Sequence, residues 1–236
     1  MEPLKQGLSL LIAAEFMQLT GRHKECMLIF TQPVKEVSLD LLKYYSKILA
    51  DAVHKDGFTP DHVLFVERAG LLIGDEIAKY FGCSIGGIAT QRYGGTTKSK
   101  FKFILRYLPR ALTHFLRQIE VLSSFHEVQS ERSIVTEYPL PGKGKKVLIV
   151  DDAIDTGYSI KAVIDYLLNE GYDRNLMRVA VITTTSKTPA FRADYSLFDQ
   201  VICAFPWSYD SRQYDQTWSE YKSKKESICE NIQMEG

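Results

Sequence analysis

Hydrophobic positions recur along the chain in two patterns, which predict an alternation of helices and strands. Apolar residues return at the spacing of an amphipathic helix in residues 8–19, 38–53, 71–80 and 159–171. Short continuous apolar runs, typical of strands buried on both faces, occupy residues 62–66, 83–90, 146–150, 178–184 and 200–205. This order of strand, loop and helix predicts an α/β fold with a mainly parallel sheet that helices cover on both faces.

The segment 98–128 departs from this order, because its pattern is helical throughout. From Lys98 to Arg117 it carries six basic residues and no acidic one. Its dense apolar positions favour a packing helix with a solvated cationic face, and a surface for a membrane or for RNA is the alternative. We expect a single domain over 1–236. It would comprise a core of about 38–210, an N-terminal helical extension 1–37, a helical insertion of about 98–138 and a C-terminal tail 211–236.

The composition is that of a globular protein without bulk charge. The chain has 29 Lys and Arg residues against 29 Asp and Glu residues, and 45% of its residues are hydrophobic. Intrinsic disorder is thereby excluded, and net charge gives no attraction to nucleic acid. No apolar run approaches the roughly 20 residues that a membrane-spanning helix needs, and the four cysteines stand singly, as reduced thiols do. We expect a cytoplasmic protein without a membrane or nucleic-acid partner.

The segment VLIVDDAIDTGYS (147–159) contains the clearest candidate site. A strand predicted to end at Val150 is followed by Asp151 and Asp152, then by Asp155 and a Thr-Gly-Tyr-Ser turn where a helix begins. Free amides at a helix N-terminus, a glycine and hydroxyl side chains form a suitable phosphate site. Because carboxylates repel a phosphate, sugar hydroxyls or a divalent cation are their natural partners. The spacing therefore predicts a phosphorylated sugar as ligand.

This segment resembles the 5-phosphoribosyl-1-pyrophosphate motif of the type I phosphoribosyltransferases, in which four apolar residues precede an acidic pair, a short variable stretch, Thr-Gly and a hydroxyl residue. The resemblance covers about 38–98 and 139–210, and it implies a five-stranded core sheet with a small hood over a nucleobase. It also implies that Asp151 and Asp152 hold the ribose hydroxyls and a Mg²⁺ ion, directly or through water or substrate. The residues that would bind phosphoribosyl pyrophosphate with them are Ala153, Ile154, Asp155, Thr156, Gly157, Tyr158 and Ser159.

Two further segments match loops of the same family. Arg68 stands where the family neutralises the leaving pyrophosphate, and Ala69 and Gly70 would bind it through backbone amides. The sequence departs from the family pattern here, since Ala69 replaces a second glycine and Glu67 stands where serine is frequent. Tyr93, followed by two glycines, stands where the mobile catalytic loop of the family begins. An exposed loop tyrosine is the alternative.

The residues that would recognise the base indicate a purine. Asp155 stands where the 6-oxopurine enzymes of the family carry an acid that exchanges a proton with purine nitrogen 7, and Lys187 stands where a lysine donates to the exocyclic oxygen. For Lys187, a solvated loop position is the alternative. Val201 and Ile202 occupy the place of a stacking aromatic in xanthine–guanine relatives. Trp207 is either a wall of the base site or a structural anchor.

The resemblance implies transfer of a phosphoribosyl group from phosphoribosyl pyrophosphate to a purine, with release of pyrophosphate in nucleotide salvage. A 6-oxopurine such as hypoxanthine, guanine or xanthine is favoured. Asp155, Arg68 and Tyr93 would be the catalytic residues, Mg²⁺ the cofactor and a homodimer the assembly. Two alternatives stay open: a non-catalytic regulator that binds phosphoribosyl pyrophosphate, and the same chemistry on a pyrimidine or an unusual base.

Overall fold

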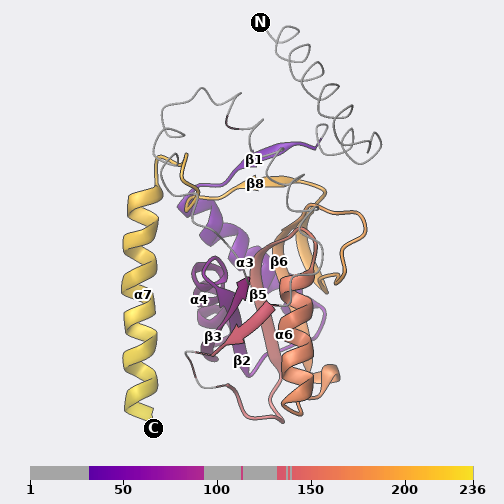
Figure 1. The fold of residues 1–236 in the computed structure, drawn as a ribbon. Helices are drawn as coiled ribbons and strands as arrows, with labels where there is room; N and C mark the ends of the chain where they lie inside the picture. The colour runs from indigo at the N-terminus through magenta and orange to yellow at the C-terminus, as the bar shows by residue number, and fades with distance from the viewer. Residues whose placement is uncertain (1–31, 93–112, 114–131, 137, 139, 236) are drawn as a thin grey trace, which may run out of the picture.

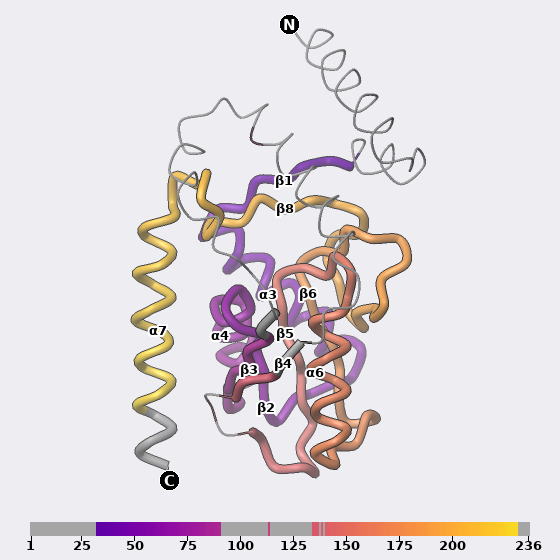
Figure 2. The backbone as a smooth tube through the Cα atoms, viewed as in Figure 1, coloured from indigo at the N-terminus to yellow at the C-terminus, as the bar shows by residue number. Residues whose placement is uncertain are grey.

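The computed structural model describes residues 32–92, 113, 132–136, 138 and 140–235, and its course is drawn in Figures 1 and 2. Six strands form the large sheet, in the order β4-β3-β2-β5-β6-β7. They are β4 (Arg132–Val135), β3 (Ser84–Arg92), β2 (His62–Glu67), β5 (Val147–Ile154), β6 (Met177–Thr184) and β7 (Tyr195–Asp199). All neighbours pair in parallel except β4, which lies antiparallel to β3 at one edge.

The central strands are buried on both faces, which explains their continuous apolar runs. In β2, Val63 and Phe65 belong to one hydrophobic cluster, whereas Leu64 and Val66 belong to the other. Successive side chains of a strand point to opposite faces of the sheet, so each face needs its own covering layer. The mainly parallel α/β sheet predicted from the sequence is confirmed.

Helices supply the two layers (Figure 1). On one face lie α3 (Leu39–Lys55) and α4 (Gly70–Phe81), and on the other lies α6 (Tyr158–Asn169), followed by a short 3-10 helix at Arg174–Leu176. Ser38 caps α3, because its hydroxyl accepts the Leu41 amide at 3.2 Å. Within the described residues, none of the helices has the combination of length and apolar character that a membrane span requires.

A second, two-stranded sheet lies beside the carboxyl ends of the central strands (Figure 1). Here β1 (Val34–Glu36) pairs in parallel with β8 (Ile202–Ala204), with Val34 opposite Ile202. The residues 200–205 were expected to add a strand to the large sheet. Instead the last parallel strand of that sheet is β7, which the sequence pattern missed because an edge strand is only half buried and therefore lacks a continuous apolar run.

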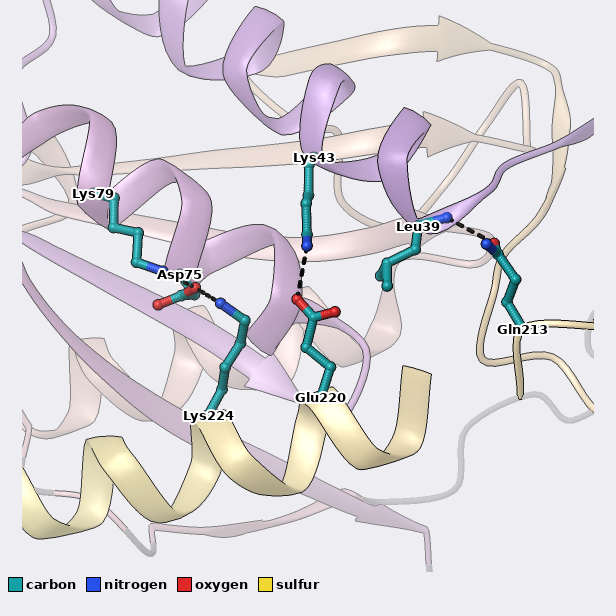
Figure 3. A network of polar contacts seen from close by, with 7 residues as sticks. All are labelled: Leu39, Lys43, Asp75, Lys79, Gln213, Glu220 and Lys224. Carbon is teal, nitrogen blue, oxygen red and sulfur yellow. Dashed lines mark hydrogen bonds and ion pairs between the residues drawn. The ribbon is translucent and has the colours of Figure 1, made fainter. Parts of the chain in front are cut away.

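The C-terminal segment, for which the sequence indicated only a tail, forms the helix α7 (Tyr214–Glu235). Its side chains Thr217, Tyr221 and Ile228 are buried, and the last two belong to the cluster shared with α3 and α4. Polar contacts attach it to both helices, as Figure 3 shows. Lys43 pairs with Glu220 at 3.0 Å, and Lys224 contacts Asp75, which Lys79 also contacts at 2.8 Å. Directly before α7, the Gln213 side-chain oxygen accepts the Leu39 amide at 2.9 Å.

Part of the predicted helical insertion 98–138 also differs from expectation. Arg132–Val135 is the antiparallel strand β4, and Tyr138 packs its ring at 5.4 Å from the ring centre of Phe65 in the core. The basic segment 98–117 lies outside the described residues apart from Thr113, and most of the N-terminal extension 1–37 lies outside them too.

At the amino end of β2, His62 is buried as a neutral imidazole. Its exposure is 6%, and its Nδ1 lies 2.8 Å from the Ser84 hydroxyl. Because that hydroxyl gives its single proton to the Asp61 carbonyl at 3.2 Å, we infer that Nδ1–H donates to it. In the described part of the chain Nε2 has no hydrogen-bond partner, and burial lowers the pKa of His62 to about 4.

This burial predicts an acid-dependent loss of stability. The unfolded chain takes up a proton on this residue near pH 6.5, whereas the folded protein takes it up only near pH 4. The free energy of unfolding should therefore fall as the pH drops from about 6.5 to about 4, by up to about 3 kcal/mol for this group, and stay level outside that window.

Urea unfolding of wild type and His62→Gln between pH 4 and pH 8 measures this contribution. The free energy of unfolding of wild type minus that of His62→Gln should fall as the pH drops from about 6.5 to about 4. His54→Gln, at an exposed histidine of α3, is the control and should retain the wild-type slope. Parallel pH profiles for wild type and His62→Gln would contradict the assignment.

Candidate functional site

The candidate site residues gather where three neighbouring parallel strands end. Glu67 ends β2 and Arg68 follows it, the acidic pair lies in the second half of β5, and Thr184 ends β6 with Thr185 directly after it. The two-stranded sheet of β1 and β8, called the hood below, lies at the same end of the large sheet (Figure 1). In open parallel sheets, ligands bind at this carboxyl edge.

Burial disfavours the charged forms of the acidic pair Asp151 and Asp152. Asp151 is buried, and its Oδ1 accepts the Asp152 amide at 2.9 Å, while Asp152 Oδ1 accepts the Ala153 amide at 2.8 Å. Burial, and then the neighbouring charge of Asp152, raise the pKa of Asp151 well above its usual range. Burial also raises the pKa of Asp152 to about 6. Such carboxylates are suited to a cation or to sugar hydroxyls, which would relieve the cost of their burial.

Asp155 is fixed by a residue that the sequence analysis missed. The Thr185 hydroxyl, nearly fully buried, donates to Asp155 Oδ1 at 2.6 Å. The Thr185 amide donates in turn to the Ile154 carbonyl at 3.0 Å. The threonine run that ends β6 was visible in the sequence, but its contact with Asp155 depends on the pairing of β5 with β6.

The turn before α6 requires its glycine. Gly157 has φ +79°, and a Cβ placed on it would lie 2.6 Å from the Phe191 amide nitrogen. The Ala190 amide donates to the Thr156 carbonyl at 2.8 Å, so the loop after β6 packs directly on this turn. As the N-cap, Gly157 offers no side chain to the first amides of α6. These amides, with the helix dipole, suit a phosphate group.

The loop between β2 and α4 packs against the strand that carries the acids. A Cβ on Gly70 would lie 2.5 Å from the Val150 carbonyl oxygen, so only glycine allows this approach. Arg68 is exposed, and its guanidinium lies 5.6 Å from the ring centre of Trp218 on α7. Ala69 is half-buried and is the N-cap of α4. The loop therefore places a cation and a helix N-terminus next to the end of β5.

The residues predicted to bind the base fall into two groups. Lys187 is exposed and lines a cavity of about 410 Å³ together with Thr184, Arg192 and Asp199. That volume is sufficient for a small ligand. No residue of the 151–159 segment lines the cavity, which instead follows the loop after β6 and the end of β7. Arg192, whose Nη2 donates to the Lys187 carbonyl at 2.9 Å, is a second cation there that the sequence analysis did not single out.

The second group belongs to the hood. The Val201 carbonyl accepts the buried Thr183 hydroxyl at 2.6 Å, which ties it to the end of β6. Ile202 is buried in β8. The Trp207 ring stacks on buried Phe205, with 4.8 Å between the ring centres and 9° between the planes, which favours its role as an anchor. Tyr93 lies outside the described residues.

The part of the chain that the structure describes contains no metal site built from protein side chains alone. Across the described residues, no group of three or more His, Cys, Asp or Glu side chains could hold an ion. The pair Asp151 and Asp152 nevertheless fits Mg²⁺ chemistry, since this ion commonly binds one or two carboxylates and takes its other ligands from substrate and water.

Comparison with known proteins agrees with this geometry. A family model described as "Phosphoribosyl transferase domain" matches residues 40–212. "Bifunctional protein PyrR" of Geobacter sp. (strain M21) is 33% identical over 60 residues, which are 25% of this chain and 34% of that protein. "Phosphoribosyltransferase domain-containing protein 1" of Homo sapiens is 40% identical over 58 residues, 24% of this chain and 25% of that protein. The matches thus span only a quarter to a third of these relatives.

Solved structures share the fold. A purine phosphoribosyltransferase from Pyrococcus horikoshii Ot3 superposes with a TM-score of 0.53 at 19% identity, over 74% of this chain and 94% of that one. Xanthine-guanine-hypoxanthine phosphoribosyltransferase from Helicobacter pylori gives a TM-score of 0.54 at 18% identity, over 79% and 99%. Since the family model covers both the strand–loop–helix site and the sheet that carries it, the chain belongs to the phosphoribosyltransferase family.

Proposed function

We propose that this protein transfers a phosphoribosyl group from phosphoribosyl pyrophosphate to a 6-oxopurine and releases pyrophosphate. The observation that carries the proposal is the acidic pair Asp151–Asp152 at the carboxyl end of a central parallel strand, directly before a glycine turn and a helix N-terminus. This arrangement offers acceptors for a sugar diol and donors for a phosphate within one short segment.

Each group of this chain would then have a distinct task. The amides and hydroxyls from Thr156 to Ser159 bind the 5-phosphate, and the acidic pair accepts the ribose hydroxyls. Arg68 and the amides of Ala69 and Gly70 bind the departing pyrophosphate. The reaction passes through a sugar cation without a covalent nucleophile, so holding the two reactants in line and balancing their charges supply the rate enhancement.

Asp151 and Asp152 would hold Mg²⁺ together with the substrate oxygens. When bound, this ion neutralises part of the pyrophosphate charge. Asp155 would take a proton from, or return one to, purine nitrogen 7, and Lys187 would donate to the exocyclic oxygen of the base, with Val201, Ile202 and Trp207 around it. Tyr93 would belong to a loop that excludes water.

The remaining expectations belong to the same proposal. The partners are phosphoribosyl pyrophosphate and a nucleobase, the assembly is a homodimer, and the place of action is the cytoplasm, in purine salvage. A single domain with extensions at both ends and an insertion is proposed as the organisation of the chain.

Pyrophosphate release with phosphoribosyl pyrophosphate and Mg²⁺ tests the proposal directly. Hypoxanthine, guanine, xanthine, adenine, orotate and uracil are offered in turn, and turnover should be highest on a 6-oxopurine. If turnover is highest on orotate or uracil, the base is a pyrimidine and the 6-oxopurine assignment is wrong. If calorimetry shows binding of phosphoribosyl pyrophosphate but no base is turned over, the protein is a regulator and not an enzyme.

The variant Asp155→Asn should lose turnover while it keeps its ligand. Asparagine retains an oxygen that can accept the Thr185 hydroxyl, now 2.6 Å from Asp155, but it cannot exchange a proton. We expect turnover on hypoxanthine to fall by about 100- to 10,000-fold, as for other general acid–base groups. Affinity for phosphoribosyl pyrophosphate, measured by calorimetry, should stay within about twofold because the shape of the turn is preserved. An unaltered turnover number would remove Asp155 from the chemistry.

The variant Lys187→Ala should weaken recognition of the keto base. An unmet polar group costs roughly 1–3 kcal/mol, so KM for hypoxanthine should rise about tenfold or more. The preference for hypoxanthine over adenine should shrink as well, since an ammonium group has only donors and cannot satisfy the adenine amino group. Lys145→Ala, at an exposed lysine before β5 and thus at the far end of the strand, is the matched control. Equal losses on both bases would make Lys187 a solvated loop residue.

A further inference from the structure

The C-terminal helix α7 contacts two successive residues, Glu67 at the end of β2 and Arg68 in the loop between β2 and α4. Lys225 Nζ lies 3.0 Å from Glu67 Oε1, and the two side chains are 29% and 8% exposed. The same oxygen accepts the Tyr138 hydroxyl at 3.2 Å. One residue further, the Arg68 guanidinium lies over the Trp218 ring of α7. The loop is thus attached to a helix that lies outside the segment matched to the family.

On its other side the loop is held by the central sheet. Gly70 approaches the Val150 carbonyl so closely that an added Cβ would lie 2.5 Å from the oxygen. The loop therefore lies between α7 and the last residue before the acidic pair. If the loop shifts on the α7 side, it cannot move closer to β5 in compensation, because Gly70 already packs tightly against the Val150 carbonyl.

The helix α7 is itself rigidly supported. Lys224 contacts Asp75 of α4, and Glu220 pairs with Lys43 of α3 (Figure 3). Tyr221 and Ile228 are buried in the core. Since these contacts fix α7 on α3 and α4, the side chains of Trp218 and Lys225 reach the loop from a fixed support.

The negative charge of Glu67 makes its contact with Lys225 important for the neighbouring Arg68. Glu67 is nearly buried and directly precedes Arg68, the cation assigned to the pyrophosphate. With Lys225 removed, the described contacts leave the Glu67 carboxylate only a neutral donor, the Tyr138 hydroxyl. A nearly buried carboxylate without a cation is strongly disfavoured, so Glu67 would compete for the adjacent guanidinium. Arg68 would then be drawn away from the ligand.

We propose that Lys225 is a positioning residue for pyrophosphate binding: by neutralising Glu67 from α7, it keeps Arg68 available to the ligand. The inference rests on the proposed function, in that the loop is taken to bind pyrophosphate. It also explains why a carboxylate is tolerated at position 67, since the compensating charge comes from a helix beyond the family core.

The test compares Lys225→Met with Lys224→Met. Methionine keeps the apolar stem and removes the charge in both, and both variants lose one ion pair between α7 and the body of the protein. Calorimetry with phosphoribosyl pyrophosphate and Mg²⁺ should show about tenfold weaker binding for Lys225→Met, within the range of coupling between contacting residues. Lys224→Met should bind within about twofold of wild type. In turnover, the loss should fall on KM for phosphoribosyl pyrophosphate rather than on kcat.

A second substitution separates charge from packing. Glu67→Gln combined with Lys225→Met removes both members of the pair and keeps a group that can bond to Tyr138, so it should recover most of the affinity. Equal affinities for Lys225→Met and Lys224→Met, or no recovery in the double variant, would overturn the proposal.

Amide hydrogen exchange in the ligand-free protein keeps the inference testable whatever the activity. Exchange at residues 68–70 should be faster in Lys225→Met than in wild type and unchanged in Lys224→Met. If wild type fails to bind phosphoribosyl pyrophosphate while this difference is present, the proposed function fails and the positioning of the loop stands. The same exchange rate in all three proteins would show that Lys225 does not position the loop.

Discussion

Burial of the central strands on both faces is the constraint on which the rest of this structure depends. Residues 147–150 of β5 are fully buried, and the chain becomes polar only at Asp151. The same change occurs at Glu67 in β2 and at Thr183 in β6. Because these strands are parallel and in register, with Val150 opposite both Phe65 and Ala180, the three polar ends meet at one edge. The register of the parallel strands alone therefore brings the polar side chains of the candidate site together at this edge.

Two glycines convert this edge into a site. Gly70 lets the loop after β2 approach the Val150 carbonyl, and Gly157 lets the turn after β5 pack under Phe191. In both places a side chain would push apart segments that, in the proposed reaction, would together surround the ligand. Each glycine also stands at the start of a helix, so the close approach brings a helix N-terminus and its free amides to the same edge.

The sequence predicted what local pattern determines and missed what distant contacts determine. The central strands, α3, α4 and α6, and the segment 147–159 all carry their own periodicity or motif. By contrast, the place of the predicted strand β8 in a separate sheet depends on its pairing with β1, which is distant in the sequence, and β7 is a half-buried edge. The contact of Thr185 with Asp155 follows from the β5–β6 register, and α7 binds through ion pairs and a tryptophan rather than through a strong apolar stripe. None of these has a local signal.

The hydrogen-bond and charge partners of the acidic side chains differ between the candidate site and the loop contact with α7. Glu67 is nearly buried and receives both a lysine from α7 and a tyrosine hydroxyl. Asp151 is buried and Asp152 is half-buried; Asp151 accepts the Asp152 amide, Asp152 accepts the Ala153 amide, and burial raises the pKa of both. A carboxylate that serves the fold is paired within the chain, since an unpaired charge costs stability. Burial of the adjacent carboxylates Asp151 and Asp152 disfavours their charged forms, so a group that donates to them or neutralises them would lower that cost, and this makes the pair suited to the ligand of the proposed reaction.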